Sequence, residues 1–359
     1  MNDIVIVGAG KTGRGFLGRL CAEAGVHVTY VDKNAELAAA LNAAGSFAVN
    51  FFGNCRPTVT VKDYSVCTWE NAVIPENALI LISVCGQNLK DAAASLKEKL
   101  IPGAKYQIIT AENSSKPSKV VREVIGMDTV SVSEGTVFCT TIEGEGLEIR
   151  SQDYPYFQYD AELLPEGYDA GIPALRPVKE FGNFLTRKLY TYNAASCVIA
   201  YLGALKGYTD YASAANDPEI LALLDKNYAE TGKALCAEYG YDPEDQAEFA
   251  LLSRKKFCDR TITDTVNRNA RDPQRKLAPA ERITGPMALI EKYGLDADVL
   301  YRTTAAALLY DAEGENAWRE IKEGKSASEL LDSVCGISAD SVSGQKILRY
   351  VREYEEGKL

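Results

Sequence analysis

Residues 3–16 read DIVIVGAGKTGRGF, and this stretch decides the fold class. Gly8, Gly10 and Gly13 follow a short apolar strand and open a helical pattern. In this setting the first glycine permits a tight turn, the second lets the backbone approach a pyrophosphate, and the third allows close packing of helix on strand. The N-terminal end of the helix then faces the phosphates. The predicted cofactor-binding loop comprises Gly8, Ala9, Gly10, Lys11, Thr12 and Gly13.

Asp32 ends the second apolar run, HVTYVD at 27–32, and lies 19 positions after Gly13. A carboxylate there binds the hydroxyls of the adenosine ribose and repels a 2′-phosphate, so we expect NAD rather than NADP as cofactor. The adjacent Lys33 acts against this preference. A P-loop is excluded, because it needs Lys and then Ser or Thr where this chain has Arg14-Gly15. A Rossmann-like domain that binds no dinucleotide stays open as the alternative.

Apolar runs and helical stretches alternate through the first half of the chain. Further strands are expected at 78–84, 106–113 and 129–151, with an inserted hairpin or edge pair at 47–64. The pattern turns almost wholly helical after Pro173–Pro177. We therefore predict an α/β chain with a Rossmann-type, doubly wound sheet with a mixed edge in residues 1–180. An all-α domain should follow in residues 181–359.

Composition narrows the classes of partner. The chain has 359 residues and a formal charge of −11, which argues against nucleic acid or an anionic membrane as partner. A single histidine excludes a site built on several histidines. The nine cysteines form no C-x-x-C pair and lie in apolar segments, which indicates reduced, buried thiols in a cytoplasmic protein. We expect no metal, no signal peptide and no membrane span.

Several motifs occur together in a specific order. They are GAGKTGRGFLG (8–18), ISVCGQNL (82–89), TAENS (110–114), RKLYTYNAAS (187–196), AYLG (200–203) and NRNARDPQRKLAPAERI (267–283). In this order they resemble the mannitol dehydrogenase family, the polyol-specific long-chain dehydrogenases that work without metal. The resemblance covers nearly the whole chain. It implies an NAD-linked enzyme that interconverts a polyol, mannitol 1-phosphate in the closest branch, and a ketose, fructose 6-phosphate. The partner is then a small polyol or sugar phosphate.

The resemblance also assigns roles to single residues. Lys188 is the general acid/base, and Asn113 and Asn193 donate to the reacting oxygen. Val84 and Asn113 also belong to the cofactor site. The family's helix motif ends in histidine, but this chain has Ser196 at that position. A serine hydroxyl still donates one hydrogen bond, but it cannot become cationic.

Helical geometry brings these side chains together. At 100° per residue, Asn193 lies at 140° and Ser196 at 80° from Lys188, so the three share one broad face. Lys188 needs a lowered pKa for its role, through burial and a neighbouring positive charge such as Arg187. Without the resemblance, the simplest interpretation of Lys188 is a solvated lysine on a helix, and that of Asn113 is a helix cap. The only histidine, His27, reads as an ordinary strand residue.

A basic segment stands out in this acidic chain. Arg268 and Lys276 match the substrate-orienting residues of the family, and Arg271 and Arg275 lie between them. Guanidinium groups bind oxyanions in a bidentate manner, so the segment is a predicted site for the substrate and its phosphate. The alternative is a solvated loop with surface charges.

Two other functions stay open at this stage. One is an NAD-dependent dehydrogenase for a different polyol, a sugar acid or a hydroxyacid. The other is a weakly active NAD-binding sensor, which the serine at position 196 favours. The sequence leaves the oligomeric state open between a monomer and a dimer.

Overall fold

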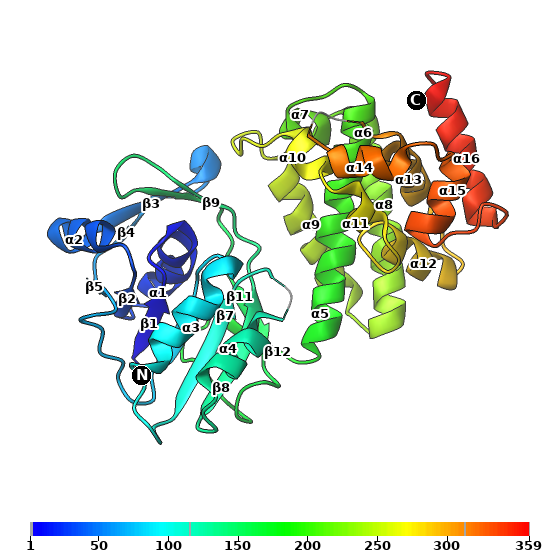
Figure 1. Ribbon diagram of the computed structural model, residues 1–359. Helices are drawn as coiled ribbons and strands as arrows, with labels where there is room; N and C mark the ends of the chain where they lie inside the picture. The colour runs from blue at the N-terminus through cyan, green and yellow to red at the C-terminus, as the bar shows by residue number, and fades with distance from the viewer. Residues whose placement is uncertain (1–2, 115, 312–313, 359) are drawn as a thin grey trace. The chain divides into compact units, whose positions relative to one another are not determined.

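The computed structural model describes residues 3–114, 116–311 and 314–358. The chain forms two compact units, the first ending at Gly182 and the second beginning at Asn183 (Figure 1). Each unit has its own buried apolar core, as expected for a chain of this length.

An eight-stranded sheet forms the centre of the first unit, in the order β12-β11-β8-β7-β6-β1-β2-β5. The strands are β1 (Ile4–Val7), β2 (Val28–Val31), β5 (Tyr64–Cys67), β6 (Leu79–Ile82), β7 (Tyr106–Ala111), β8 (Val130–Thr136), β11 (Phe157–Asp160) and β12 (Leu175–Val178). From β5 to β8 all neighbours are parallel, whereas β11 runs antiparallel to β8. The predicted Rossmann-type sheet with a mixed edge is thus confirmed.

Helices cover both faces of this sheet. On one face α3 (Leu89–Lys97) and α4 (Pro117–Ile125) lie side by side (Figure 1) and bury Leu96 and Val121 against the apolar strand residues. On the other face the π-helical η1 (Gly13–Gly18) continues into α1 (Arg19–Glu23). The remaining short elements are α2 (Ala35–Ala44), η2 (Phe52–Asn54) and η3 (Gly86–Asn88).

A second, four-stranded sheet was not predicted as a separate layer. It has the order β4-β3-β10-β9, with β3 (Phe47–Phe51), β4 (Val59–Val61), β9 (Thr141–Glu143) and β10 (Ile149–Ser151). The expected hairpin is present, since β3 and β4 pair antiparallel. This sheet packs on η1 at Gly15, where a Cβ would come within 2.2 Å of the Ile149 side chain. Glycine is therefore required there by close approach.

Two strands of the main sheet escaped the sequence analysis. β11 lies in a tyrosine-rich stretch, and β12 contains Pro177. Proline lacks the amide hydrogen that a central strand must donate, so its presence argued against a strand. The structure resolves this because β12 is the edge strand, paired only with β11.

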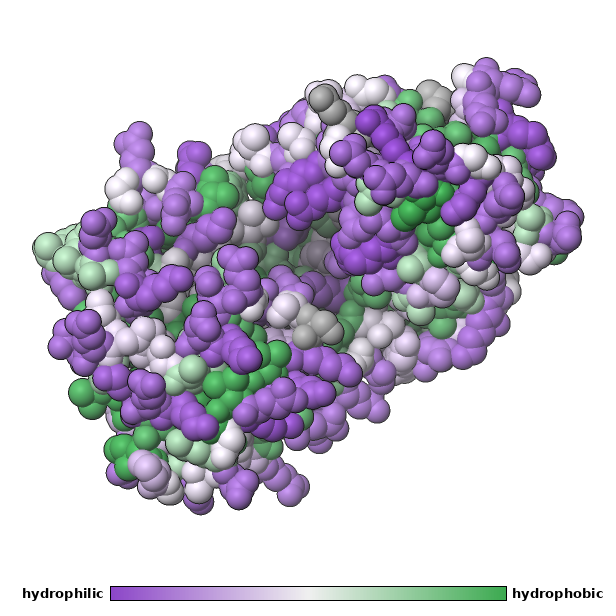
Figure 2. Space-filling view, in the orientation of Figure 1, coloured by the Kyte–Doolittle hydropathy of each residue, from purple (hydrophilic) through white to green (hydrophobic). Residues whose placement is uncertain are grey.

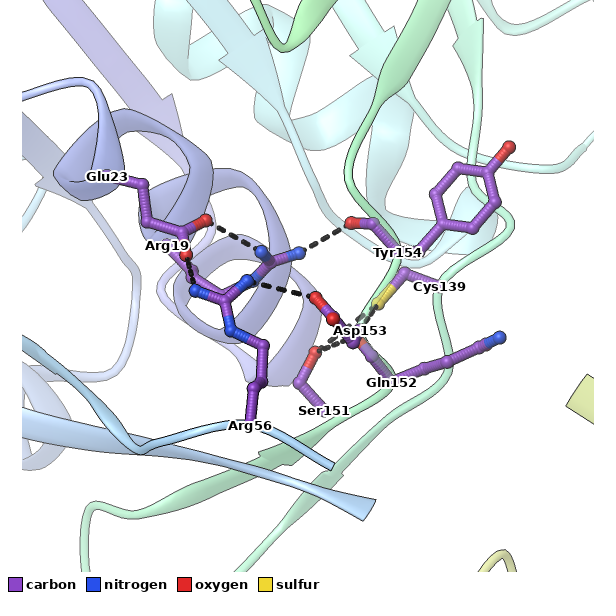
Figure 3. A network of polar contacts seen from close by, with 8 residues as sticks. All are labelled: Arg19, Glu23, Arg56, Cys139, Ser151, Gln152, Asp153 and Tyr154. Atoms are coloured by element: carbon purple, nitrogen blue, oxygen red, sulfur yellow. Dashed lines mark hydrogen bonds and ion pairs between the residues drawn. The ribbon is translucent and has the colours of Figure 1, made fainter. Parts of the chain in front are cut away.

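A network of charged groups ties α1 to the chain between β10 and β11 (Figure 3). The guanidinium of Arg19 is fully buried and donates to Glu23 at 2.7 Å and to the Tyr154 carbonyl at 2.6 Å. Arg56 pairs with Glu23 and, at 3.0 Å, with Asp153. Because buried charges need partners, this network holds the segment in a defined place beside the helix.

The second unit consists of helices around one apolar core. They are α5 (Phe181–Lys188), η4 (Leu189–Asn193), α6 (Ala194–Leu205), α7 (Tyr211–Ala215), α8 (Pro218–Tyr239), α9 (Pro243–Cys258), α10 (Val266–Ala270), α11 (Pro273–Leu277), α12 (Thr284–Lys292), α13 (Asp298–Leu309), α14 (Asn316–Lys322), α15 (Ala327–Leu330), η5 (Leu331–Cys335) and α16 (Val342–Glu355). The two longest, α8 and α9, both begin at an Asp-Pro pair. Asp217 and Asp242 cap the first amide groups, and the prolines take the position where no amide hydrogen is needed.

Hydrophilic side chains cover most of the visible surface of each unit (Figure 2). Within the described residues, no helix has the length and apolar character needed to cross a bilayer.

The cysteine prediction was right about the thiols but partly wrong about burial. All nine cysteines are free, and four of them are buried: Cys21, Cys139, Cys197 and Cys335. Cys55 and Cys85, however, are exposed, because each lies in a loop rather than in a strand or helix core.

Candidate functional site

The glycine loop lies at the carboxyl end of β1, where open α/β sheets place their ligands. Gly8 has φ of 100°, and a Cβ there would lie 2.3 Å from the Ser83 carbonyl oxygen. A Cβ on Gly13 would lie 2.0 Å from the Gly8 carbonyl oxygen. At Gly10 a Cβ would meet nothing within 4 Å. The loop is thus tightly packed on its inner side and leaves the backbone at Gly10 open to a ligand.

Arg14 supports this loop, a role that the sequence analysis did not assign to it. Its side chain is 2% exposed and donates from Nε to the Ala9 carbonyl and from Nη1 to the Leu147 carbonyl, both at 2.6 Å. The guanidinium also lies 5.5 Å from the centroid of the Phe47 ring. Burial lowers the pKa of Arg14. The second sheet therefore helps to hold the loop through a buried cation.

Of the other predicted cofactor residues, Lys11 and Thr12 belong to the loop, and Asp32 and Val84 lie beside it. The Asp32 carboxylate accepts from the Ala9 amide at 2.7 Å and from the Asn34 amide at 2.8 Å. Each oxygen keeps capacity for a further hydrogen bond, as a carboxylate has about four acceptor positions. The Lys11 side chain is exposed, and the Thr12 hydroxyl lies 3.2 Å from the Thr141 hydroxyl. Val84 follows β6 and lies beside Gly8.

Asn113 joins the ends of two strands. Its Nδ2 donates to the Val137 carbonyl, and its Oδ1 accepts from the Val137 amide, each at 3.0 Å. Oδ1 also accepts from the Thr136 hydroxyl at 3.2 Å. The helix-cap alternative is wrong, because the residue before α4 is Lys116. Asn113 is held in one orientation at the carboxyl end of β7.

Lys188, Asn193 and Ser196 lie on one continuous helix formed by α5, η4 and α6. Between Leu189 and Asn193 this helix is π-helical, with the Ala194 amide donating to the Leu189 carbonyl five positions back. The purely α-helical angles expected above are therefore wrong across this turn. In a π-turn, residues five apart stand above one another, so Asn193 comes closer to the face of Lys188. Such turns often occur at functional sites.

Lys188 is only partly exposed, and the protein atoms around it are dense enough for desolvation to dominate. Burial lowers the pKa of Lys188 to about 7, and the positive charge of Lys256 on α9 acts in the same direction. An amine with this pKa exchanges protons readily near neutral pH.

Arg187 does not supply the neighbouring charge. It is 6% exposed and points to α9, where it donates to Gln246 Oε1 at 2.7 Å and pairs with Asp245 at 2.7 Å. Its guanidinium also lies over the Phe249 ring at 4.3 Å. Lys256, more than 60 positions away in sequence, takes the role expected of Arg187. No periodicity of the chain signals that pairing.

The two other polar residues on this helix are available to a ligand in different ways. Among the described residues, none forms a hydrogen bond with the Asn193 side chain, which is partly exposed. Ser196 Oγ accepts from the Tyr211 hydroxyl at 3.1 Å. Tyr192, which precedes Asn193, is buried against Phe249 and Phe257 and belongs to the core.

The four residues of the basic segment do not form one surface patch, because three are exposed and one is buried. Arg268, Arg271 and Arg275 are exposed, and Arg268 pairs with Asp264 at 2.8 Å. Lys276 is 5% exposed and donates to the Asn269 carbonyl. Burial lowers the pKa of Lys276 to about 8.

Lys276 lies in the layer between α6 and α10. Its amine lies 5.6 Å from the centroid of the Tyr201 ring on α6, and the Tyr201 hydroxyl donates to the Ala270 carbonyl at 2.8 Å. α10, which carries Arg268, is thereby fastened to the helix that carries Ser196.

His27 pairs with the neighbouring strand region. Its Nδ1 lies 2.6 Å from Asp63 and its Nε2 lies 3.3 Å from the Ser65 hydroxyl. His27 is exposed and lies one residue before β2 (Val28–Val31), so its interpretation as a strand residue is wrong by one position. Among the described residues, no group of three or more His, Cys, Asp or Glu side chains is arranged to hold a metal ion.

Comparison with known proteins shows which family the chain is similar to. Residues 180–352 match the model of the mannitol dehydrogenase C-terminal domain. Mannitol-1-phosphate 5-dehydrogenase of Exiguobacterium sibiricum is 26% identical, over 97% of this chain and 96% of that protein. The second half of the chain thus matches the mannitol dehydrogenase family, and nearly the whole chain is similar to a mannitol-1-phosphate 5-dehydrogenase. The resemblance drawn from the sequence motifs is thus confirmed.

A second relative has the same name, whereas the first unit also matches the model of a different family. Mannitol-1-phosphate 5-dehydrogenase of Paenarthrobacter aurescens is 28% identical over 85% of each chain. Residues 4–158 also match the model of ketopantoate reductase PanE/ApbA.

Two solved structures share the fold. Substrate-free D-sorbitol dehydrogenase has a TM-score of 0.78 at 14% identity, covering 99% of this chain and 93% of that one. Pseudomonas fluorescens mannitol 2-dehydrogenase, in ternary complex with NAD and D-mannitol, has a TM-score of 0.68 at 12% identity, covering 99% and 92%.

Proposed function

We propose that this chain is a metal-independent, NAD-linked dehydrogenase of the mannitol dehydrogenase family. It interconverts mannitol 1-phosphate and fructose 6-phosphate by hydride transfer. The observation that carries the proposal is Lys188, a desolvated amine with a pKa of about 7 on the helix that bears the family motif. The relatives named mannitol-1-phosphate 5-dehydrogenase, which align over most of the chain, support the choice of substrate.

The residues of the first unit fit an NAD molecule. The open backbone at Gly10 suits a pyrophosphate, because no side chain or neighbouring atom occupies that space. Asp32 retains acceptor capacity for the ribose hydroxyls, and we propose Lys11, Thr12, Val84 and Asn113 as the other contacts. When bound, NAD supplies the hydride acceptor or donor. We propose that residues 1–180 form this cofactor domain and residues 181–359 the substrate domain.

Lys188 is the general acid and general base of the proposed reaction. During ketose reduction the charged amine gives a proton from Nζ to the carbonyl oxygen, which becomes the hydroxyl of the polyol. During polyol oxidation the neutral amine takes that proton back. Asn193, on the same helix, donates a hydrogen bond to the oxygen as negative charge develops on it, an effect of several kcal/mol in other enzymes.

The basic segment supplies the substrate contacts. Arg268 is the strongest candidate for a phosphate or hydroxyl ligand, because its guanidinium is exposed and stands on the helix fastened to α6. Arg271 and Arg275 extend the positive surface, and Lys276 contributes from the buried side. In a chain of net charge −11, these residues attract an anionic substrate locally.

A second candidate function is an NAD-binding sensor with weak turnover. The observation that favours it is Ser196, which replaces the family's histidine and cannot become cationic. A close variant of the first proposal keeps the dehydrogenase chemistry but acts on another polyol, a sugar acid or a hydroxyacid. The two classes differ in whether any carbonyl compound is reduced.

The deciding measurement is NADH oxidation by the purified chain with fructose 6-phosphate, fructose, tagatose and several keto acids. We expect turnover with fructose 6-phosphate and at least about tenfold less with fructose, since the phosphate adds charged hydrogen bonds. NADPH should serve less well than NADH because of Asp32. Micromolar NADH binding without turnover on any of these compounds contradicts the dehydrogenase and supports the sensor.

The pH dependence of this reaction has an expected sign. Reduction needs the charged form of Lys188, so kcat/KM for the ketose should fall as pH rises through about 7. Lys256→Met removes the like charge and should move this midpoint upward by about half a unit to one unit. Lys255→Met, on the exposed side of the same helix, is the matched control and should leave the midpoint unchanged. A downward shift, or an equal shift in both variants, contradicts the assignment.

A further inference from the structure

Ser196 has a buried partner that the family motif does not mention. The Tyr211 hydroxyl donates to Ser196 Oγ at 3.1 Å. Tyr211 is 4% exposed, whereas Ser196 is partly exposed. The tyrosine of this pair is therefore shielded from solvent, whereas the serine is accessible to a ligand.

In this pair the tyrosine is the hydrogen-bond donor and the serine is the acceptor. Burial raises the pKa of Tyr211 well above its ordinary value, so the phenol keeps its proton at any physiological pH. Ser196 Oγ is then the acceptor, and its own hydrogen is left for another acceptor. Within the described part of the chain, no residue accepts that hydrogen. The Ser196 hydroxyl is thus an oriented donor with an unused proton on its exposed side.

Tyr211 is held firmly enough to orient a neighbour. It is the first residue of α7, whose N-cap Asp210 accepts from the Ser213 amide at 2.7 Å. The Tyr211 amide donates to the Asp264 carbonyl at 3.1 Å, and its ring packs edge-on against Phe257 with centroids 5.8 Å apart. These contacts leave the hydroxyl little freedom.

The same contacts connect Tyr211 to the substrate segment. The carboxylate of Asp264 pairs with Arg268 at 2.8 Å, and Asp210 forms a β-bridge with Thr265 just before α10. The position of Tyr211 is therefore set by the segment that carries the proposed phosphate ligand. One buried ring links that segment to the helix of Lys188 and Ser196.

We infer that Tyr211 is a positioning residue for the proposed reaction. It fixes the Ser196 hydroxyl so that the serine hydrogen points to the substrate oxygen. A neutral Tyr–Ser chain of hydrogen bonds thereby takes the place of the single histidine of the family. Each hydrogen bond in such a chain polarises the next and strengthens it. No proton leaves the pair, so its effect does not depend on pH in the neutral range. This inference rests on the proposed function.

Tyr211→Phe tests the inference, since it removes the hydroxyl and keeps the ring. We expect kcat for fructose 6-phosphate reduction to fall about three- to tenfold, the scale of one hydrogen bond, with KM changed less than about twofold. NADH affinity and the pH midpoint of Lys188 should stay as in the wild type. Phe257→Leu is the matched control, because it loosens the packing of the same ring and leaves the hydroxyl pair in place. It should lower the melting temperature without this loss of kcat.

A double-mutant cycle with Ser196→Ala separates a positioning role from a purely structural one. If Tyr211 acts through Ser196, the double variant should have the same kcat as Ser196→Ala alone. An equal loss in both backgrounds, or no loss in Tyr211→Phe, overturns the inference while the proposed function stands. If the wild type binds NADH but reduces none of the ketoses, the proposed function fails, and the inference fails with it.

Discussion

Lys188→Met should lower kcat/KM for ketose reduction by about 100- to 10,000-fold, the usual contribution of a general acid. The reason is that no other group on the same helix face can carry a proton at neutral pH, since Asn193 and Ser196 do not titrate there. NADH affinity should be unchanged, because the proposed cofactor residues lie in the first unit. Steady-state kinetics and NADH fluorescence titration measure the two quantities.

The same variant has an independent readout in stability. The pKa of Lys188 is lowered from 10.5 to about 7 in the folded chain, so between these pH values the unfolded chain binds the extra proton. The free energy of unfolding of the wild type should therefore gain from Lys188 as pH rises across this window. At pH 6 the folded wild type must bury a charged amine, which Lys188→Met lacks, so the variant should be more stable than the wild type. At pH 10 the amine is neutral in the folded chain, so the difference should be smaller.

Lys255→Met serves as the control for the general effect of losing a lysine. It should show neither the loss of activity nor the change in pH-dependent stability, because its side chain is exposed. Activity of Lys188→Met within tenfold of the wild type would exclude Lys188 as the proton donor. An unchanged pH dependence of stability would show instead that Lys188 has an ordinary pKa.

Gly10→Ala should raise the dissociation constant of NADH at least about tenfold and leave the melting temperature within a degree or two of the wild type. The added Cβ meets nothing within 4 Å in the chain itself, and Gly10 does not adopt a left-handed φ. Only a ligand whose phosphates approach this backbone would collide with the methyl group. The variant therefore separates cofactor binding from folding.

Gly13→Ala is the comparison variant. Its Cβ would lie 2.0 Å from the Gly8 carbonyl oxygen, so the loop must move. It should lose both NADH affinity and thermal stability. Unchanged NADH affinity in Gly10→Ala would contradict pyrophosphate binding at this loop, whatever happens in Gly13→Ala.

Local patterns in the sequence predicted a large part of this molecule. The glycine spacing and the alternation of apolar runs with helices were sufficient for the parallel sheet, because both signals act over a few residues. The strand β12 and the separate second sheet were missed for a physical reason. Pro177 is tolerated only because its strand lies at an edge, and β3 pairs with β10 across about 100 residues of chain. Neither fact has a local signature.

The candidate site shows the same division. Family motifs selected Lys188, Asn193 and Ser196, but α-helical angles misplaced them across the π-turn at Leu189–Asn193. An apolar period read at 100° per residue assumes an α-helix throughout, so it does not reveal a turn of this kind. The neighbouring charge was expected from Arg187 because it is adjacent in sequence, yet the fold turns that side chain toward Asp245.

By itself the sequence determined the nucleotide-binding loop, the acid after the second strand, and the change from an α/β half to a helical half. These features depend on backbone conformation and on apolar periodicity, which neighbouring residues set. Only the tertiary structure decided which groups tune them. Lys256 lowers the pKa of Lys188, Arg14 reaches the Leu147 carbonyl 133 positions away, and Tyr211 orients Ser196. The contacts of Arg14 and Tyr211 form because buried polar groups need hydrogen-bond partners, whereas Lys256 comes near Lys188 because the fold packs α9 against η4.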